Sequence, residues 1–329
     1  MSKLKLGIAV GDYDRMRPLV DGTVGIDGVD PQYMLLDPEE IFFRAFRHAD
    51  FDICELSMSS YSVKTAAGEC PYIAVPVFPS RAFRHTSIYV RTDRIKQPSD
   101  LRGKRVGLPE YQLTANVWAR MVLEEDFGIK PSDVIWVRGG YESPGRIEKI
   151  AVNLPSDVRI ESVPEGTTLS GELERGGLDA VIGPRAPSCF DRGAPNVGYL
   201  FPDPQEAAKE WYRRTKLFPI MHLLGIRKTL AEAHPWLPSA VFKAFERSKS
   251  VALAKLGDTS ATKVTLPFVE EQLRAARALM GEDFWPYGLE PNRHVLGRFL
   301  ERHHQEGLSS RLLQPEELFH PAALEMHKI

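Results

Sequence analysis

Short apolar runs separated by polar or glycine-rich segments recur along the chain, and they predict β-strands. The first run is Leu-Lys-Leu-Gly-Ile-Ala-Val at 4–10, and others lie at 51–56, 73–78, 88–90, 135–137 and 180–182. Between the first strands, segment 38–46 begins with Pro and two Glu residues, which suits the first turn of a helix. Strands that alternate with helices in this way predict an α/β fold.

The pattern also predicts two lobes, which a length of 329 residues favours. Segment 96–108 combines a helical turn, a glycine stop and a new strand, and a helix should follow from Thr114 to a stop at Gly128. A helix at 205–215 leads into the apolar run 218–226, which returns the chain to the first lobe before helices at 237–254, 269–280 and 294–304. We therefore assign 1–95 and 217–329 to lobe 1 and 96–216 to lobe 2. We expect a cleft between the lobes, where small ligands usually bind.

Composition narrows the classes of function. Hydrophobic residues make up 43% and charged residues 26%, as in ordinary globular proteins, and the formal charge of −2 gives no basic surface for nucleic acid. Cys54, Cys70 and Cys189 lack C-x-x-C spacing, which argues against a disulfide framework or a zinc site, and we expect reduced core thiols. The adjacent histidines 303–304 should diverge on a helix surface.

The chain shows neither a membrane-spanning pattern nor a secretory one. No run approaches the roughly 18 apolar residues that a spanning helix needs. The first residues lead directly into a strand pattern instead of a signal-peptide core. We therefore expect a cytoplasmic protein. The oligomeric state is left open, and a homo-oligomer is compatible with the sequence.

The segment 77–85, Val-Phe-Pro-Ser-Arg-Ala-Phe-Arg-His, concentrates reactive side chains between two strand patterns. It contains Ser80, Arg81, Arg84 and His85. Arginine matches a carboxylate with two parallel hydrogen bonds, and histidine exchanges a proton near neutral pH. The simpler interpretation is a surface turn with solvated charges, but buried strands on both sides make it weaker. The segment therefore favours an acidic small molecule as ligand.

Longer phrases resemble two known groups of proteins. Segments 100–107 and 176–180 look like the second lobe of type II periplasmic binding proteins. The phrases at 55–61, 78–85, 106–112, 218–222 and 285–288 resemble the 4,5-dihydroxyphthalate decarboxylase family. Segment 63–70 departs from the Arg-Gly-Asp-like ending expected after Ser-Ser-Tyr, so substrate choice could differ there.

The resemblance implies a two-lobed type II periplasmic-binding-protein-like fold, with a mixed sheet flanked by helices in each lobe. It also implies a carboxy-lyase of phthalate degradation, which converts 4,5-dihydroxyphthalate to protocatechuate and CO2. A hydroxyl para to the leaving carboxylate supplies the electrons, so we expect no organic cofactor and assign no metal ligands. A solute-binding protein for a small organic anion, or another cytosolic enzyme on this fold, remains the alternative.

Site roles follow from this chemistry. Arg81 and Arg84 are candidates for the two carboxylates, although both need not point inward. His85, His222 and Glu55 are candidates for the acid that protonates the ring carbon, and we favour His85 because two arginines flank it. The alternatives are a core histidine bonded to backbone for His222 and a carboxylate paired with an arginine for Glu55. The expected binding frame comprises Ser57, Ser59, Ser80, Tyr111, Thr114, Arg185 and Tyr287, with capping or core packing as the alternative for each.

Overall fold

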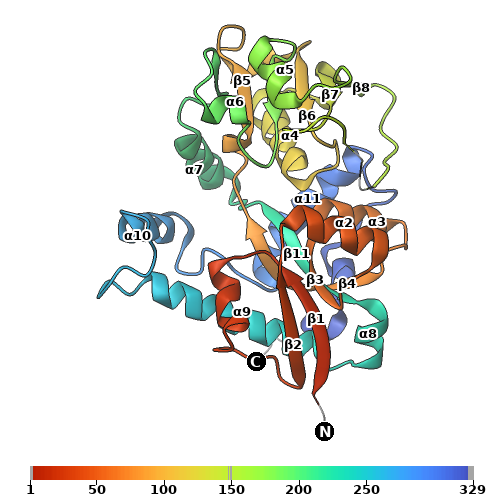
Figure 1. Ribbon diagram of the computed structural model, residues 1–329, viewed down its shortest axis with the longest axis vertical. Coiled ribbons are helices and arrows are strands. Elements are labelled where there is room, and N and C mark those ends of the chain that lie inside the picture. The colour runs from red at the N-terminus through yellow and green to blue at the C-terminus, as the bar shows by residue number, and fades with distance from the viewer. Residues whose placement is uncertain (1–2, 147, 149, 325–329) are drawn as a thin grey trace. The chain divides into compact units, whose positions relative to one another are not determined.

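The computed structural model describes residues 3–146, 148 and 150–324. The chain divides into two compact units (Figure 1). Unit 1 combines the chain up to Arg81 with Ile220–Gly297 and the segment from Leu313 onward. Unit 2 combines Ala82–Pro219 with Arg298–Leu312. Each unit is built around its own sheet.

The sheet of unit 1 has five strands in the order β2-β1-β3-β11-β4. β1 is parallel to β2 and β3, whereas β11 is antiparallel to both β3 and β4. The carboxyl ends of β1, β3 and β4 therefore lie at the same edge as the start of β11. The strands are β1 (Leu4–Val10), β2 (Val29–Leu35), β3 (Ile53–Ser57), β4 (Tyr72–Arg81) and β11 (Ile220–Arg227).

Helices cover this sheet, and their ends follow from local sequence. Asp37 caps α2 by accepting a hydrogen bond from the Glu39 N–H, and Ala49 ends the helix in the left-handed conformation. The long helix α9 contacts the 3₁₀ turn η1, helix α1 and strand β4. The helical elements are η1 (Asp14–Met16), α1 (Arg17–Val20), α2 (Pro38–His48), α3 (Met58–Ala66), α8 (Lys228–Ala233), α9 (Leu237–Leu256), α10 (Val269–Met280), η5 (Glu290–Asn292), η6 (Pro315–Leu318) and α12 (Pro321–Leu324).

The sheet of unit 2 has six strands in the order β10-β5-β9-β6-β7-β8. β6 to β9 run parallel, and β5 is antiparallel to β9 and β10. Unit 2 thus begins at Ala82 and contains β5, whose residues the sequence analysis placed in lobe 1. The strands are β5 (Ile88–Arg91), β6 (Arg105–Leu108), β7 (Ile135–Arg138), β8 (Arg159–Ser162), β9 (Ala180–Ile182) and β10 (Val197–Tyr199).

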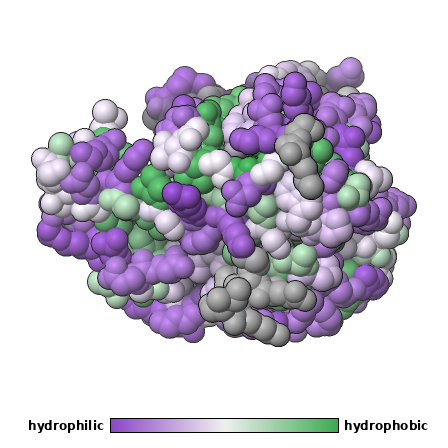
Figure 2. All heavy atoms as spheres, turned by 90° about the horizontal axis from the view of Figure 1, so that it is seen from below, coloured by the Kyte–Doolittle hydropathy of each residue, from purple (hydrophilic) through white to green (hydrophobic). Residues whose placement is uncertain are grey.

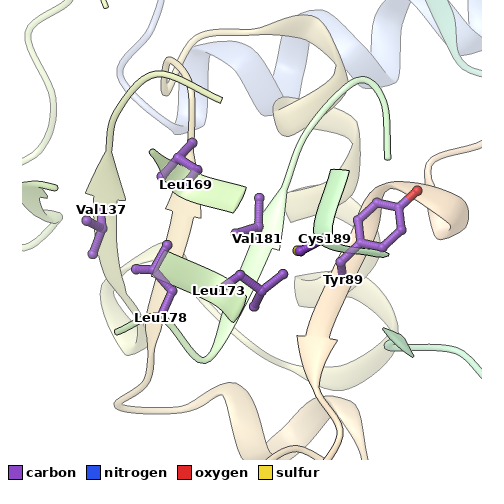
Figure 3. Packing of buried hydrophobic residues seen from close by; sticks show 7 residues of the cluster. All are labelled: Tyr89, Val137, Leu169, Leu173, Leu178, Val181 and Cys189. Carbon is purple, nitrogen blue, oxygen red and sulfur yellow. The ribbon is translucent and has the colours of Figure 1, made fainter. Parts of the chain in front are cut away.

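The helices of unit 2 pack an apolar core against this sheet. The helical elements are η2 (His85–Ser87), η3 (Pro98–Leu101), α4 (Thr114–Phe127), η4 (Pro131–Asp133), α5 (Leu169–Arg175), α6 (Ser188–Asp191) and α7 (Pro204–Thr215), and α11 (Arg293–Gln305) passes from unit 1 into unit 2. Figure 3 shows side chains from α5, α6 and three strands converging in one buried cluster. Gly107 in β6 allows this close packing, because a Cβ would lie 2.7 Å from Leu178 Cδ1 and 2.9 Å from Leu169 Cδ2 and would force these side chains to shift.

The predicted strands and helices are confirmed at nearly every position. Segment 4–10 is β1, segment 269–280 is α10, and Gly128 ends α4 with a φ of 64°. The three cysteines are free and buried, as expected. The interpretation of 303–304 as surface histidines is wrong for His303, which is fully buried on α11.

The face of the molecule shown in Figure 2 is mainly hydrophilic. Within the described residues, the exposed large hydrophobic side chains are Phe43, Trp236, Leu266, Phe268 and Leu312. None of the helices in the described ranges combines the length and the apolar character needed to cross a bilayer.

Candidate active site

The functional side chains of unit 1 gather at the edge where β1, β3 and β4 end and β11 begins. Ligands of α/β sheets usually bind at such an edge, because loops from several strand ends meet there. The register places His222 on β11 opposite both Ser57 on β3 and Ser80 on β4. Residues that are far apart in the sequence therefore become neighbours through strand pairing.

Glu55 and His222 form a buried pair at this edge. The Glu55 side chain is fully buried, and its Oε1 atom contacts His222 Nδ1. Its Oε1 also accepts a hydrogen bond of 2.9 Å from the Tyr13 hydroxyl, and its Oε2 accepts one of 2.9 Å from the Gly11 N–H. The partner of Glu55 is thus a histidine, whereas the sequence analysis considered an arginine.

The surroundings of Glu55 keep it ionised. Burial alone would raise the pKa of this carboxyl, but the His222 charge and the hydrogen bonds from His222, Gly11 and Tyr13 hold it below its usual value. A carboxylate on Nδ1 orients the imidazole and leaves Nε2 available for proton exchange. The rings of Phe42 and His222 pack edge to face with their centres 4.8 Å apart, and the His222 side chain remains 16% exposed. The pair has the geometry of an oriented proton donor.

Tyr13 and Arg15 belong to the same edge, although the sequence analysis missed them. Burial and the neighbouring Glu55 carboxylate raise the pKa of the Tyr13 hydroxyl, so it stays a donor to Glu55. The Arg15 guanidinium carbon lies 4.2 Å from the Tyr13 ring centre and 4.5 Å from that of Trp285. The available signal was their position directly after the first predicted strand, at its carboxyl end.

Arg81 is a buried link between β4 and segment 286–292. Its Nη2 donates to the Pro286 carbonyl at 2.8 Å and to the Asn292 side-chain oxygen, and its guanidinium lies 5.0 Å from the Phe78 ring centre. Asn292 in turn donates to the carbonyls of Pro286 and Gly288. Arg81 thus holds the loop that carries Trp285 and Tyr287.

The other unit 1 candidates are also buried near this edge. Tyr287 is 3% exposed, its hydroxyl has no hydrogen-bond partner within the described residues, and burial raises its pKa. Ser57 precedes the first residue of α3, and Ser59 is fully buried in that helix. Ser80 is half-buried in β4. Their proposed contacts with a substrate stay predictions.

His85 lies in the aromatic core of unit 2. It is 2% exposed, and its ring centre lies 5.2 Å from that of Phe201 and 5.7 Å from that of Trp211. Its Nδ1 atom is buried without a hydrogen-bond partner in the described part of the chain. Burial lowers the pKa of His85 to about 4, with a smaller opposing effect of Asp126. At neutral pH the ring is therefore uncharged, and its role as an acid stays an untested prediction.

Arg84 lies at the carboxyl edge of the unit 2 sheet. Its Nη1 contacts the Ser87 hydroxyl at 3.4 Å and the Pro184 carbonyl at 3.5 Å, which are weak hydrogen bonds. Burial lowers the pKa of the Arg84 guanidinium to about 10. A nearby anion would therefore stabilise its charged form.

The remaining unit 2 candidates differ in burial. Thr114 is the first residue of α4, which has no side-chain cap. Tyr111 is 1% exposed and packs 3.8 Å from the Arg120 guanidinium carbon, whereas Arg185 is exposed. Sequence reasoning missed the fully buried Glu110, which accepts a 2.8 Å hydrogen bond from Arg146 Nε. Within the described residues, no cluster of three or more His, Cys, Asp or Glu side chains could hold a metal ion.

Comparisons with known proteins place the fold in a class. A Candida albicans gene product with the generic periplasmic binding protein fold matches with a TM-score of 0.51 and 10% identity, covering 93% of this chain and 91% of that one. The periplasmic aliphatic sulphonate binding protein SsuA from Escherichia coli matches with a TM-score of 0.55 and 14% identity, covering 97% and 98%. At these identities the matches show the fold alone: two mixed sheets with flanking helices, as in periplasmic binding proteins.

The sequence comparison defines the family. A 4,5-dihydroxyphthalate decarboxylase from Comamonas testosteroni is 72% identical over the full length of both chains. Another from Pseudomonas putida is 72% identical over 214 residues, which are 65% of this chain and 83% of that protein. The chain belongs to the 4,5-dihydroxyphthalate decarboxylase family. No family model matches the chain.

Proposed function

We propose that this protein removes one carboxylate from 4,5-dihydroxyphthalate and releases protocatechuate and CO2. The observation that carries the proposal is the 72% identity, over the full length of both chains, to a 4,5-dihydroxyphthalate decarboxylase from Comamonas testosteroni. The edge of unit 1 supports it independently, because it combines a histidine with a buried carboxylate on its Nδ1 and two arginines. A proton donor and cationic groups are what loss of CO2 from an aromatic dicarboxylate requires.

In the reaction, the hydroxyl para to the leaving carboxylate supplies the electrons. As this hydroxyl gives its proton to solvent, charge moves to the ring carbon that bears the carboxylate, and the same oxygen takes a proton back from solvent after CO2 has left. The His222 imidazolium gives its Nε2 proton to that carbon, and a C–H bond forms. The bond to the carboxylate then breaks, CO2 leaves, and its electron pair restores the aromatic ring. His222 takes a new proton from solvent before the next turnover.

We assign the donor to His222 in preference to His85. Glu55 orients the His222 ring through its Nδ1 atom, whereas the aromatic core around His85 disfavours charge. A positioned general acid typically contributes about 10²- to 10⁴-fold to the rate. Arg84 is retained as a candidate carboxylate ligand, since an anion beside it would offset the cost of burying its charge.

Incubation of the purified protein with 4,5-dihydroxyphthalate tests the function. We expect equal amounts of CO2 and protocatechuate, and in D2O one deuterium at the carbon that lost its carboxylate. Phthalate is the matched control, because it has both carboxylates but no hydroxyl to supply electrons, and it should not react. Binding of 4,5-dihydroxyphthalate without CO2 release would contradict the proposal.

A further inference from the structure

Arg15 is held in place from several sides. Its Nε donates to the Pro79 carbonyl at 2.6 Å, and its guanidinium lies between the rings of Tyr13 and Trp285. Its backbone carbonyl accepts a 2.7 Å hydrogen bond from the Ser248 hydroxyl of α9. The side chain therefore has little conformational freedom left to lose when a ligand binds.

Part of this guanidinium remains available. The Arg15 side chain is 16% exposed, and among the described residues no hydrogen bond is made by its Nη2 atom. Its Nη1 contacts Asp14 at 3.1 Å, but that carboxylate is half exposed, and exposed ion pairs of this kind contribute little. Arg81 differs, because its Nη2 is already bonded to Pro286 and Asn292. Of the two arginines, Arg15 therefore has the guanidinium group whose Nη2 is better able to donate hydrogen bonds to an anion.

The position of Arg15 links it to the proton donor. The Tyr13 ring stacks on the guanidinium, and the Tyr13 hydroxyl donates to the same Glu55 oxygen that contacts His222. One aromatic side chain thus separates the cation from the Glu55–His222 pair. The carboxylate that leaves loses its charge during the reaction, so a strong ion pair to it would oppose the step. The carboxylate that stays keeps its charge throughout and suits a fixed cation.

We propose that Arg15 binds the carboxylate that the substrate retains and so positions the adjacent ring carbon, which loses the other carboxylate, beside His222. This inference rests on the proposed function. It assigns substrate binding and positioning to a residue on the loop after β1, and it predicts that binding of the product, which has only the retained carboxylate, depends on Arg15 as much as binding of the substrate does.

The test compares Arg15→Gln with wild type in the full-length protein. We expect the KM for 4,5-dihydroxyphthalate and the Kd for protocatechuate to rise together by about 10- to 100-fold, as for loss of a charge-assisted hydrogen bond, with kcat changing much less. Catechol, which has no carboxylate, should bind both proteins alike. Arg15→Lys should recover part of the affinity, because it keeps the charge without the fork.

Arg17→Gln is the matched control, because Arg17 is an exposed arginine on the next turn, paired with Asp12, and its loss should leave all constants unchanged. Unchanged protocatechuate affinity in Arg15→Gln would overturn the inference. Equal weakening of protocatechuate and catechol, with a lower melting temperature, would instead show a purely structural role and also overturn it. If wild type binds protocatechuate through Arg15 but releases no CO2 from the substrate, the proposed function fails while the anion site stands.

Discussion

The two candidate histidines should respond in opposite ways to substitution. We expect His222→Gln to lower kcat by about 10²- to 10⁴-fold, because the carboxamide can still donate a hydrogen bond to Glu55 but has no acidic proton to transfer to the ring carbon. His85→Leu should leave kcat within about threefold of wild type. The leucine fills the space between Phe201 and Trp211 and removes a buried nitrogen that lacks a partner.

The magnitude for His85 follows from its burial. With a pKa of about 4, roughly one molecule in a thousand carries the charged ring at pH 7, which corresponds to a cost of about 4 kcal/mol for charging it. A ring that is so costly to protonate is poorly suited to act as a proton donor at neutral pH.

Steady-state kinetics with CO2 detection measures both variants, and circular dichroism confirms their folding. Near-native kcat in His222→Gln, together with a loss of more than about a hundredfold in folded His85→Leu, would refute the reasoning and return the donor to unit 2.

Three further outcomes are expected. Because burial depresses the pKa of His85, the folded protein should lose about 3 kcal/mol of stability as pH falls from 6.5 to 4, and His85→Leu should remove this loss in urea titrations at several pH values. Arg81→Met should lower the free energy of unfolding by about 2–4 kcal/mol and raise KM more than it lowers kcat, since Pro286 and Asn292 lose their buried donor; an unchanged melting temperature would contradict this. Turnover should survive dialysis against EDTA without added cofactor, because the para hydroxyl supplies the electrons; complete loss, restored by one divalent metal, would refute it.

Much of the secondary structure was predictable because it depends on local sequence. The alternation at 4–10, the Pro-Glu-Glu start at 38–40 and the glycine stop at 128 each act within a few residues, and the structure confirms all three. The family phrases were also local, so membership could be inferred from the printed sequence. His303 is the counterexample, because the packing partners that bury a helix face are distant in sequence.

The composition of the site depended on strand order instead. Nothing in the sequence near Glu55 indicates that β11 will insert between β3 and β4 and bring His222 to its side. The same holds for Tyr13 and Arg15, whose loop joins the site because β1 pairs in parallel with β3. His85 was favoured for its arginine neighbours along the chain, but its charge is governed by aromatic rings more than a hundred residues away. The sequence by itself therefore determined the elements, the family and the residue types of the chemistry. The tertiary structure decided which of them meet and which are ionised, because pairing and burial are set by contacts between distant segments.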